Sequence, residues 1–565
     1  MTTNPDPGSS PLLALGGRIA TLDDSATVID PGVVYCRDGN IVAVQPATAS
    51  KPSGFEAVPV TATGGTVLPG LIELHNHMPY DVLGLWQVPK AYSNRDQWSS
   101  ASNPDYHRLV TGPMQVLGAD PAVVPAIVRY TEVRALLGGT ATGQGIALAK
   151  SAIISHFRGL VRNVESTHDP DLKPAATHIA DIDATDADHF LARLSGSQKL
   201  ILHLSEGITT ATDTHAHDAF AALHLPDGRW AITDNLIGIH CLALTAADFT
   251  IFAEHGGSMV WSPLSNLLLY GQTADLGAAL AAGVPVALGS DWAPSGSKNV
   301  LGELKVAQAV APTVGATLTA LDLVRMVTTA PAAMLGWQDH IGSLEPGKRA
   351  DLIVLDGQTG DPYQQLIDAT EADLHLVMVN GTPRVGTPGL MNALVPGLRG
   401  TSGGTPTPGN GAETMRIAGR ERTLNLAQTT ADPAVAQVTV RDALDALSQA
   451  LANLPHTGQP TPPAALLASA HAQSAALLAA SGLVNNHMSP RPHLPFRGHL
   501  TGPNLDDIRS TPLTPPIHAA TAANSAPLPA LTLDPLTAVD NPGYYATLAA
   551  EQNIPANVRT AIANP

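Results

Sequence analysis

The chain has 565 residues, more than one compact core usually holds, which predicts two or three domains. It is 44% apolar and 14% charged with a formal net charge of −18, so it is globular by composition and disfavours binding to nucleic acid or anionic membranes. The two cysteines, Cys36 and Cys241, exclude a disulfide framework and a cysteine-rich zinc module.

The N-terminal residues, MTTNPDPGSSPLL, lack the basic and apolar regions of a signal peptide. No apolar run approaches the roughly 20 residues that a membrane-spanning helix needs. We therefore expect a cytoplasmic protein that has no membrane partner.

Residues 12–60 have the pattern of short strands, with a hairpin signal in Asp-Gly-Asn at 38–40. From about residue 66, apolar strands alternate with helical stretches about eight times, which predicts parallel β/α units closed into a (β/α)8 TIM barrel. Residues 341–385 return to strands, so we expect one β-sandwich built from both flanks of the barrel.

The predicted fold class is therefore α/β, with four segments along the chain. Residues 1–66 and 341–430, the latter with a flexible linker at 400–411, form the two parts of the β-sandwich. Residues 67–340 form the barrel. Residues 431–565 form an Ala/Pro-rich helical extension, with amphipathic helices expected at 439–454 and 464–482.

The first barrel strand ends in an unusual way, LPGLIELHNHMPY at 68–80. His75 and His77 are two residues apart, and strand residues two apart share a face. Both imidazoles can therefore reach one metal ion. A second such pair, His215 and His217, lies in a helical stretch, where these positions diverge, and we expect it to bind nothing.

Three further apolar strands end in polar residues: His203 with Glu206 three positions later, His240, and Asp291. A single residue of this kind is equally well explained as a cap or a hydrogen-bonded core residue. Four strand ends in series are harder to explain in that way, because such ends gather at one face of a barrel. Three imidazoles and one carboxylate suit zinc or iron(II), with a position left for water.

These strand ends carry a recognisable set of motifs. They are PGLIELHNH (69–77), HLSEG (203–207), IGIHC (237–241), WSPLSNLLLYG (261–271), VALGSDWAPSGSKNVLGELK (286–305) and TTAPAAMLGWQDHIGSLEPGKRADLIVLD (328–356). In this order, over about residues 12–390, they resemble the amidohydrolase superfamily of metal-dependent hydrolases. The likeness is closest to the branch of cytosine, s-triazine and thiomethyladenosine deaminases.

The resemblance implies a role for each residue. Glu206 would be the proton shuttle, and His240 would hydrogen-bond the attacking water or the substrate. The implied ligands of one divalent metal ion are His75, His77, His203 and Asp291, and Asp291 would also accept a proton. Some superfamily members hold a second metal through a lysine on the fourth strand. The corresponding residues here, 176–182, contain no lysine, which favours one ion: zinc first, with iron or manganese open.

An aromatic insert, residues 78–98, follows the first strand. Either it is a lid that stacks on a flat substrate, or it is a small core beneath a long loop. Trp261 and Trp292 depart from the motifs of the superfamily, and Trp261 either lines the pocket or packs outward. The candidate substrate-binding residues are Tyr80, Trp86, Trp98, Trp261, Asn266 and Trp292.

We therefore expect a mononuclear metal-dependent hydrolase that acts on a non-peptide carbon–nitrogen bond of a small, cyclic substrate, in the manner of a deaminase. The alternative within the superfamily is hydrolysis of a cyclic amide or an N-acyl bond. A hypothesis of another class, a non-catalytic metal-binding scaffold, is disfavoured because every predicted ligand is present. For the oligomeric state, a homodimer is the default expectation.

Overall fold

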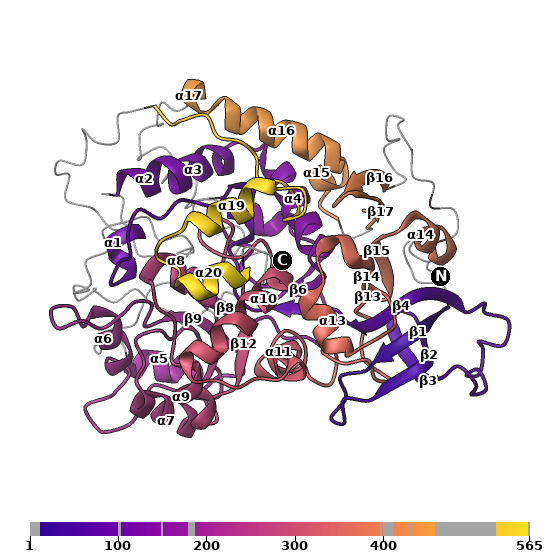
Figure 1. Cartoon of the computed structure of the whole chain (residues 1–565), viewed down its shortest axis with the longest axis horizontal. Helices are drawn as coiled ribbons and strands as arrows, with labels where there is room; N and C mark the ends of the chain where they lie inside the picture. Colours follow the sequence, from indigo (N-terminus) through magenta and orange to yellow (C-terminus); the bar gives the residue numbers. More distant parts are fainter. Residues whose placement is uncertain are drawn as a thin grey trace.

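The structure of the protein, a computed structural model, describes residues 12–99, 103–148, 151–178, 187–395, 398, 411–428, 431–457 and 527–562. The predicted linker, apart from residue 411, and the predicted helix at 464–482 lie outside the described residues. Within the described part, the strands form one large sheet beside two smaller parallel sheets that are surrounded by helices (Figure 1).

The large sheet has nine strands in the order β16-β17-β15-β14-β13-β4-β1-β2-β3. Their bounds are β1 Leu13–Ala20, β2 Val28–Arg37, β3 Asn40–Pro46, β4 Thr61–Pro69, β13 Leu352–Asp356, β14 Leu374–Val379, β15 Thr382–Gly386, β16 Ala412–Ile417 and β17 Arg420–Asn425. Strand β4 pairs with β13 in antiparallel register, with Leu352 opposite Pro69.

The two flanks of the chain are therefore joined in one sheet, as their shared strand pattern predicted. Direct pairing of β4 with β13 makes one continuous sheet of the described strands from both flanks. β4 also runs across the predicted boundary at residue 66.

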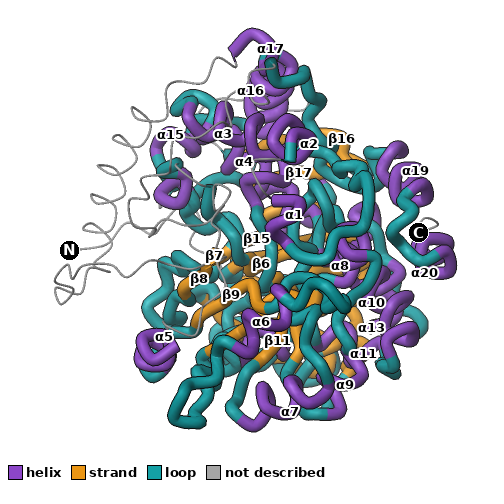
Figure 2. Tube along the Cα trace, turned by 90° about the vertical axis from the view of Figure 1, so that its left-hand side faces the viewer, coloured by secondary structure: helices purple, strands orange, loops and turns teal. Residues whose placement is uncertain are grey.

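Eight parallel strands are described between these flanks, in two sheets near the middle of the molecule (Figure 2). One sheet holds β5 Leu71–Glu73, β6 Thr140–Gly143 and β7 Arg162–Asn163. The other holds β8 Ala176–His178, β9 Leu200–Leu204, β10 Leu236–His240, β11 Ser258–Trp261 and β12 Val286–Leu288. Backbone hydrogen bonds connect them: Ala175 donates to Val164 at 3.0 Å, Asp291 donates to His75 at 3.0 Å, and His77 donates to Asp291 at 2.8 Å. The chain thus has a mixed α/β fold with parallel sheets.

Helices cover the outside of the parallel strands (Figure 2). They are α4 Val124–Leu137, α5 Ala187–Leu194, α6 His215–Ala221, α7 Ala246–Glu254, α8 Pro263–Tyr270, α9 Leu276–Ala281, α10 Val300–Val310, η4 Ala311–Val314, α11 Ala320–Arg325 and α12 Thr329–Met334. Side-chain caps fix several of their starts. Thr245 and Thr319 form capping boxes, and Asn299 accepts from the Gly302 amide at 2.9 Å.

The aromatic insert and the segment after it are mostly short helical turns. They are η1 Met78–Val82, α1 Arg95–Ser99, α2 Pro104–Tyr106, η2 His107–Thr111 and α3 Gly112–Ala119, with η3 Ile153–His156 further on. Beside the large sheet lie α13 Pro362–Asp368, η5 Glu371–Asp373 and α14 Pro388–Leu394.

The first predicted helix of the C-terminal extension is confirmed. It is α16, Val440–Ala452, between α15 Pro433–Ala436 and α17 Leu454–Thr457, and it packs against α4 (Figure 1). Its apolar face is buried at Leu447 and Leu451, which explains the predicted amphipathic pattern.

Residues 527–562, with α19 Pro542–Ala550 and α20 Ala556–Ile562, lie across the parallel-strand region (Figure 1). Asp534 is the anchor of this segment. Its carboxylate accepts from Arg134 at 2.7 Å and from Lys298, and all three side chains are buried. Its backbone amide donates to Val82 at 3.2 Å. The segment is therefore tied both to the turn after β5 and to the loop after β12.

Among the described helices, none combines the length and the apolar character that crossing a membrane requires.

The Asp534 network gives a first prediction. Asp534→Asn should lower the free energy of unfolding by about 3–5 kcal/mol, because it removes the buried carboxylate that pairs with both Arg134 and Lys298. Denaturant unfolding measures this. Asp188→Asn, which removes an exposed ion pair with Arg229, is the control and should change nothing measurable. Equal effects of the two variants would contradict the prediction.

Candidate metal centre

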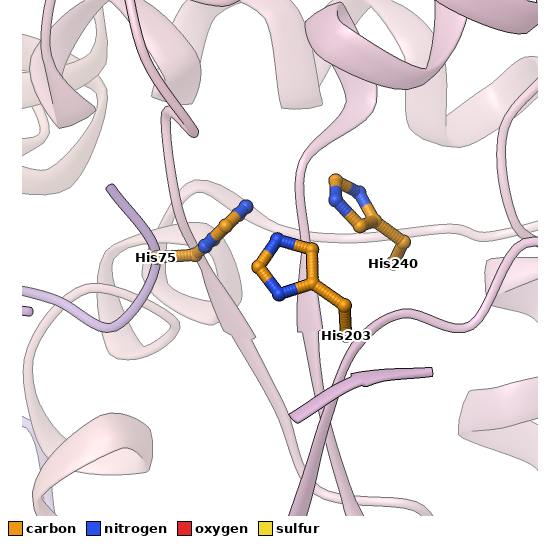
Figure 3. Close-up of side chains that lie close together, drawn as sticks. All are labelled: His75, His203 and His240. Carbon is orange, nitrogen blue, oxygen red and sulfur yellow. The ribbon is translucent and has the colours of Figure 1, made fainter. Parts of the chain in front are cut away.

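Polar side chains from four strand ends meet at one place. His75 and His77 follow β5, His203 lies in β9, His240 ends β10 and Asp291 follows β12. The ring centroid of His75 lies 4.8 Å from that of His203 and 5.0 Å from that of His240. Figure 3 shows these three rings turned toward one another from separate strands. The structure thus brings together the predicted ligand set and His240.

The donor atoms converge closely. Nε2 of His75 and Nε2 of His77 lie 3.0 Å and 3.5 Å from the same carboxylate oxygen, Oδ1 of Asp291. One nitrogen or oxygen from each of His75, His77 and Asp291 can be chosen so that all lie within 4.8 Å of one another, and the same holds for His75, His203 and His240. The centre therefore offers two overlapping groups of three donors.

The buried nitrogens of this cluster test whether a metal fits it. Nδ1 of His75 and Nδ1 of His203 make no hydrogen bond, although both residues are buried. Buried polar atoms rarely stay unsatisfied, because the lost hydration costs free energy. Imidazole and carboxylate donors in this arrangement suit a divalent metal ion.

Burial keeps the imidazoles of His77, His203 and His240 neutral, and the neighbours of Asp291 keep its carboxylate charged. Burial lowers the pKa of His77 and of His240 to about 3, and it holds the pKa of His203 well below its usual range. Burial alone would raise the pKa of Asp291, but neighbouring His75 and His240 outweigh it and hold that pKa well below its usual range. Neutral imidazole and ionised carboxylate are the forms that bind metals.

The backbone at the strand ends is strained. Ser205, His240 and Asp291 all have positive φ, at 53°, 66° and 68°. Such conformations in non-glycine residues cost free energy and concentrate at functional sites. Gly289 permits the close approach of β12 to β5, since a Cβ there would lie 2.5 Å from the Cβ of His75.

A second layer of buried polar groups supports the ligands. Oε1 of Glu73 accepts from the Ser290 amide at 3.1 Å, from the Ser290 hydroxyl and from Asn76 Nδ2 at 3.2 Å. Burial raises the pKa of Glu73 to about 7. Ser265 donates to Oδ2 of Asp291 at 2.6 Å. These hydrogen bonds fix the segment that carries Asn76, between His75 and His77, and the residue next to Asp291.

His240 and Glu206 each have a partner on helix α8. Nδ1 of His240 lies 2.8 Å from Oδ1 of Asn266, which can only accept, so Nδ1 carries the proton. Nε2 of His240 is then an acceptor, 3.9 Å from Oε1 of Glu206. The Tyr270 hydroxyl donates to that Oε1 at 2.7 Å, and the Trp98 indole donates to the Tyr270 hydroxyl at 2.8 Å.

Three of the predicted substrate-binding aromatics form a buried wall beside the histidines. Trp292 lies edge-on to His77, with centroids 5.5 Å apart, and to Tyr80 at 5.3 Å. Trp86 lies further out, 6.0 Å from Tyr106. All of these side chains are nearly inaccessible to solvent. The insert is therefore packed as a core, and Tyr80 and Trp292 are the members nearest to the metal centre.

The other three predicted substrate-binding residues make protein contacts. Trp98 and Asn266 are engaged as described above. Trp261 follows Val260, which points into the apolar interior of the strands, so Trp261 points to the helix layer. Its indole donates to Thr273 at 2.8 Å. Of the two alternatives for Trp261, the structure has the outward one.

The second His-x-His pair, His215 and His217, lies on helix α6 and its side chains diverge, as expected for a helix. His217 pairs with Asp248 at 2.9 Å, and His215 lies 3.4 Å from Asp96 at the surface.

A cavity of about 310 Å³ adjoins the loops that follow Glu206 and His240. Its lining is Ile208, Thr209, His217, Leu242, Ala243, Thr245 and Gln272.

Sequence reasoning missed Tyr270, Ser265, Glu73 and Ser290. One signal was available for Tyr270. It stands four residues after Asn266 in a short helix, and residues four apart share a helix face. Ser265 and Glu73 belong to the recognised motifs, but no pattern indicates that their side chains turn toward Asp291 and Ser290.

Comparisons with known proteins agree with this geometry. Residues 198–384 match the model of the amidohydrolase family. A 5-methylthioadenosine/S-adenosylhomocysteine deaminase of Desulforudis audaxviator is 27% identical over 388 residues, which covers 63% of this chain and 87% of that protein. An S-triazine hydrolase of Gordonia rubripertincta is 33% identical over 159 residues, 27% of this chain and 32% of that protein.

A solved structure shares the fold. The atrazine chlorohydrolase of Arthrobacter aurescens, complexed with zinc, is 18% identical with a TM-score of 0.51, covering 68% of this chain and 100% of that one. The predicted resemblance to the deaminase and s-triazine hydrolase branch is confirmed by the family match and the two sequence relatives. Residues 198–384 thus resemble the amidohydrolase family, and the chain is an amidohydrolase-type hydrolase that acts on carbon–nitrogen bonds other than peptide bonds.

Proposed function

We propose that the protein is a mononuclear, zinc-dependent deaminase of a small cyclic amidine. The observation that carries the proposal is the convergence of His75, His77, His203 and Asp291 next to a buried Glu206. These four residues would hold the ion. The ring centroid of His240 lies 5.0 Å from that of His75 and 5.4 Å from that of His203, but Asn266 fixes the His240 proton on Nδ1, which suits a hydrogen-bonding role for Nε2.

The chain's own groups would carry the proton transfers. A bound divalent metal supplies Lewis acidity and makes water a nucleophile near neutral pH. Asp291, held by Ser265, would accept a proton from the attacking water. Glu206 would then carry this proton to the departing nitrogen, so that the water oxygen replaces an amino group and ammonia leaves. His240 would orient the attacking water by accepting a hydrogen bond from it at Nε2.

The eight parallel strands would form a closed (β/α)8 barrel, residues 67–340, with the metal centre at the carboxyl ends of the strands. The two hydrogen bonds between β12 and β5, and the bond between β7 and β8, support closure. Residues 1–66 and 341–430 would form the flanking β unit, and 431–565 an extension that covers the barrel. A closed barrel explains why ligands far apart in sequence converge.

The substrate would be small and partly flat. Trp292 and Tyr80 present aromatic rings beside His77, against which a heterocycle can pack. The names of the two relatives refer to methylthioadenosine and s-triazine. Both compounds contain nitrogen heterocycles that carry amino groups or equivalent leaving groups.

Metal content tests the ligand set. His77→Ala should lower the bound zinc from about one ion per chain to a small fraction after dialysis, because three-coordinate sites lose affinity steeply. Elemental analysis of purified protein measures this. His215→Ala removes a surface imidazole of the other His-x-His pair and should leave the metal content unchanged. Full metal content in His77→Ala would contradict the proposed site.

Ammonia release tests the reaction. Across aminopurines, aminopyrimidines, amino-s-triazines and their nucleosides, we expect at least one substrate to release ammonia in proportion to enzyme. Glu206→Gln should lower kcat for it by about 10²–10⁴-fold, because the carboxylate no longer transfers a proton.

The same panel should include cyclic ureas and N-acyl compounds. Activity on these alone, with no ammonia from any amino heterocycle, would replace deamination by amide hydrolysis. Turnover that persists in Glu206→Gln would remove Glu206 from the proposed mechanism.

A further inference from the structure

The aromatic insert makes direct contacts with the segment that carries Glu206. Asn94 and Gly207 form an antiparallel bridge, and the Ile208 amide donates to the Ser93 carbonyl at 2.7 Å. Asp213 accepts from the side chains of both Ser93 and Asn94, which closes this contact from the other side. The insert is therefore an extra strand-like edge beside the turn that follows β9.

The insert is also bound to helix α8. The Tyr92 amide donates to the Leu269 carbonyl at 2.8 Å, and the Trp98 indole donates to the hydroxyl of Tyr270 at 2.8 Å. Both Trp98 and Tyr270 are buried. The insert thus bridges the turn after β9, which carries Glu206, and helix α8, which carries Tyr270. The side chains of these two elements meet at Oε1 of Glu206.

We propose that Trp98 and Tyr270 are positioning residues for Glu206, linked in one relay from the insert to the carboxylate. Trp98 Nε1–H donates to the Tyr270 oxygen, and the Tyr270 O–H can then donate only to Oε1 of Glu206. This inference rests on the proposed role of Glu206 in proton transfer. It gives the insert a function other than stacking on substrate: it fixes the direction of the carboxylate.

The geometry requires that direction to be fixed. Tyr270 carries one hydroxyl proton, and an indole nitrogen can only donate, so the two hydrogen bonds have a single consistent polarity. Oε1 of Glu206 also lies 3.9 Å from Nε2 of His240. The bond from Tyr270 restrains rotation of the carboxylate about its last torsion, and proton transfer depends steeply on such placement.

A double-mutant cycle tests the relay. Tyr270→Phe keeps the ring and removes the hydroxyl, and it should lower kcat by about 10–100-fold with KM changed less than about twofold, because a misplaced carboxylate slows the transfer step but not binding. Trp98→Phe should lower kcat by a smaller factor, about 3–10-fold, since the Tyr270–Glu206 bond remains. The double variant should match Tyr270→Phe alone, because Trp98 acts only through Tyr270.

Two matched controls separate the relay from packing. Tyr130→Phe removes an equally buried hydroxyl that donates to the backbone of Asp534, and Trp337→Phe removes a buried indole that donates to Lys173 at 3.1 Å. Both should leave kcat and metal content unchanged, even where they lower the melting temperature. Additive losses from Trp98→Phe and Tyr270→Phe, or an unchanged kcat in Tyr270→Phe, would overturn the relay.

Crystal structures of the wild type and of Tyr270→Phe give a readout that needs no substrate. The relay predicts that the Glu206 carboxylate rotates or splits into two conformers in the variant while His75, His77 and Asp291 keep their positions. An unmoved Glu206 would overturn it. Failure of the wild type to hydrolyse any compound of the panel would instead overturn the proposed reaction, and the crystallographic result would still decide the relay.

Discussion

Two backbone hydrogen bonds between the first and the last parallel strand determine the geometry of the metal centre. Asp291 donates to the carbonyl of His75, and His77 donates to the carbonyl of Asp291, at 3.0 Å and 2.8 Å. They align the two segments so that both imidazoles meet one carboxylate oxygen. The positions of His203 and His240 follow from the regular parallel register of β9 with β10. Gly289 matters for the same reason, because a side chain there would push β12 away from His75.

Burial makes this arrangement costly unless every group has a partner. Four imidazoles and two carboxylates lie in nearly solvent-free space, where an unpaired polar atom is expensive. The contact with His75 keeps Asp291 ionised, while desolvation keeps His77, His203 and His240 neutral. A divalent cation completes this set, because it offers the neutral imidazoles an acceptor for their lone pairs and the carboxylate a counter-charge.

Two additions to the parallel-strand region reinforce the loops around the centre from different directions. The insert connects to the β9 turn and to α8 through backbone bonds and through Trp98. The C-terminal segment connects the turn after β5 to the loop after β12 through Val82, Lys298 and Asp534. Precise placement of catalytic groups needs supporting contacts of this kind, since loops alone are poorly defined. The long aromatic insert and the C-terminal segment thus have a shared structural effect.

The sequence by itself determined the alternation of strands and helices, the helix at 439–454 and the polar residues at the strand ends. These are local patterns, and each depends on neighbouring residues only. It also indicated the convergence of His75, His77, His203 and Asp291, because parallel strands place their carboxyl ends at one edge. Only the tertiary structure decided that β4 pairs with β13 in one sheet, that Trp261 points outward, and that Trp98 reaches Tyr270 rather than open space. Those outcomes depend on contacts between residues far apart in the chain, and no local pattern specifies which distant partner a buried side chain will meet.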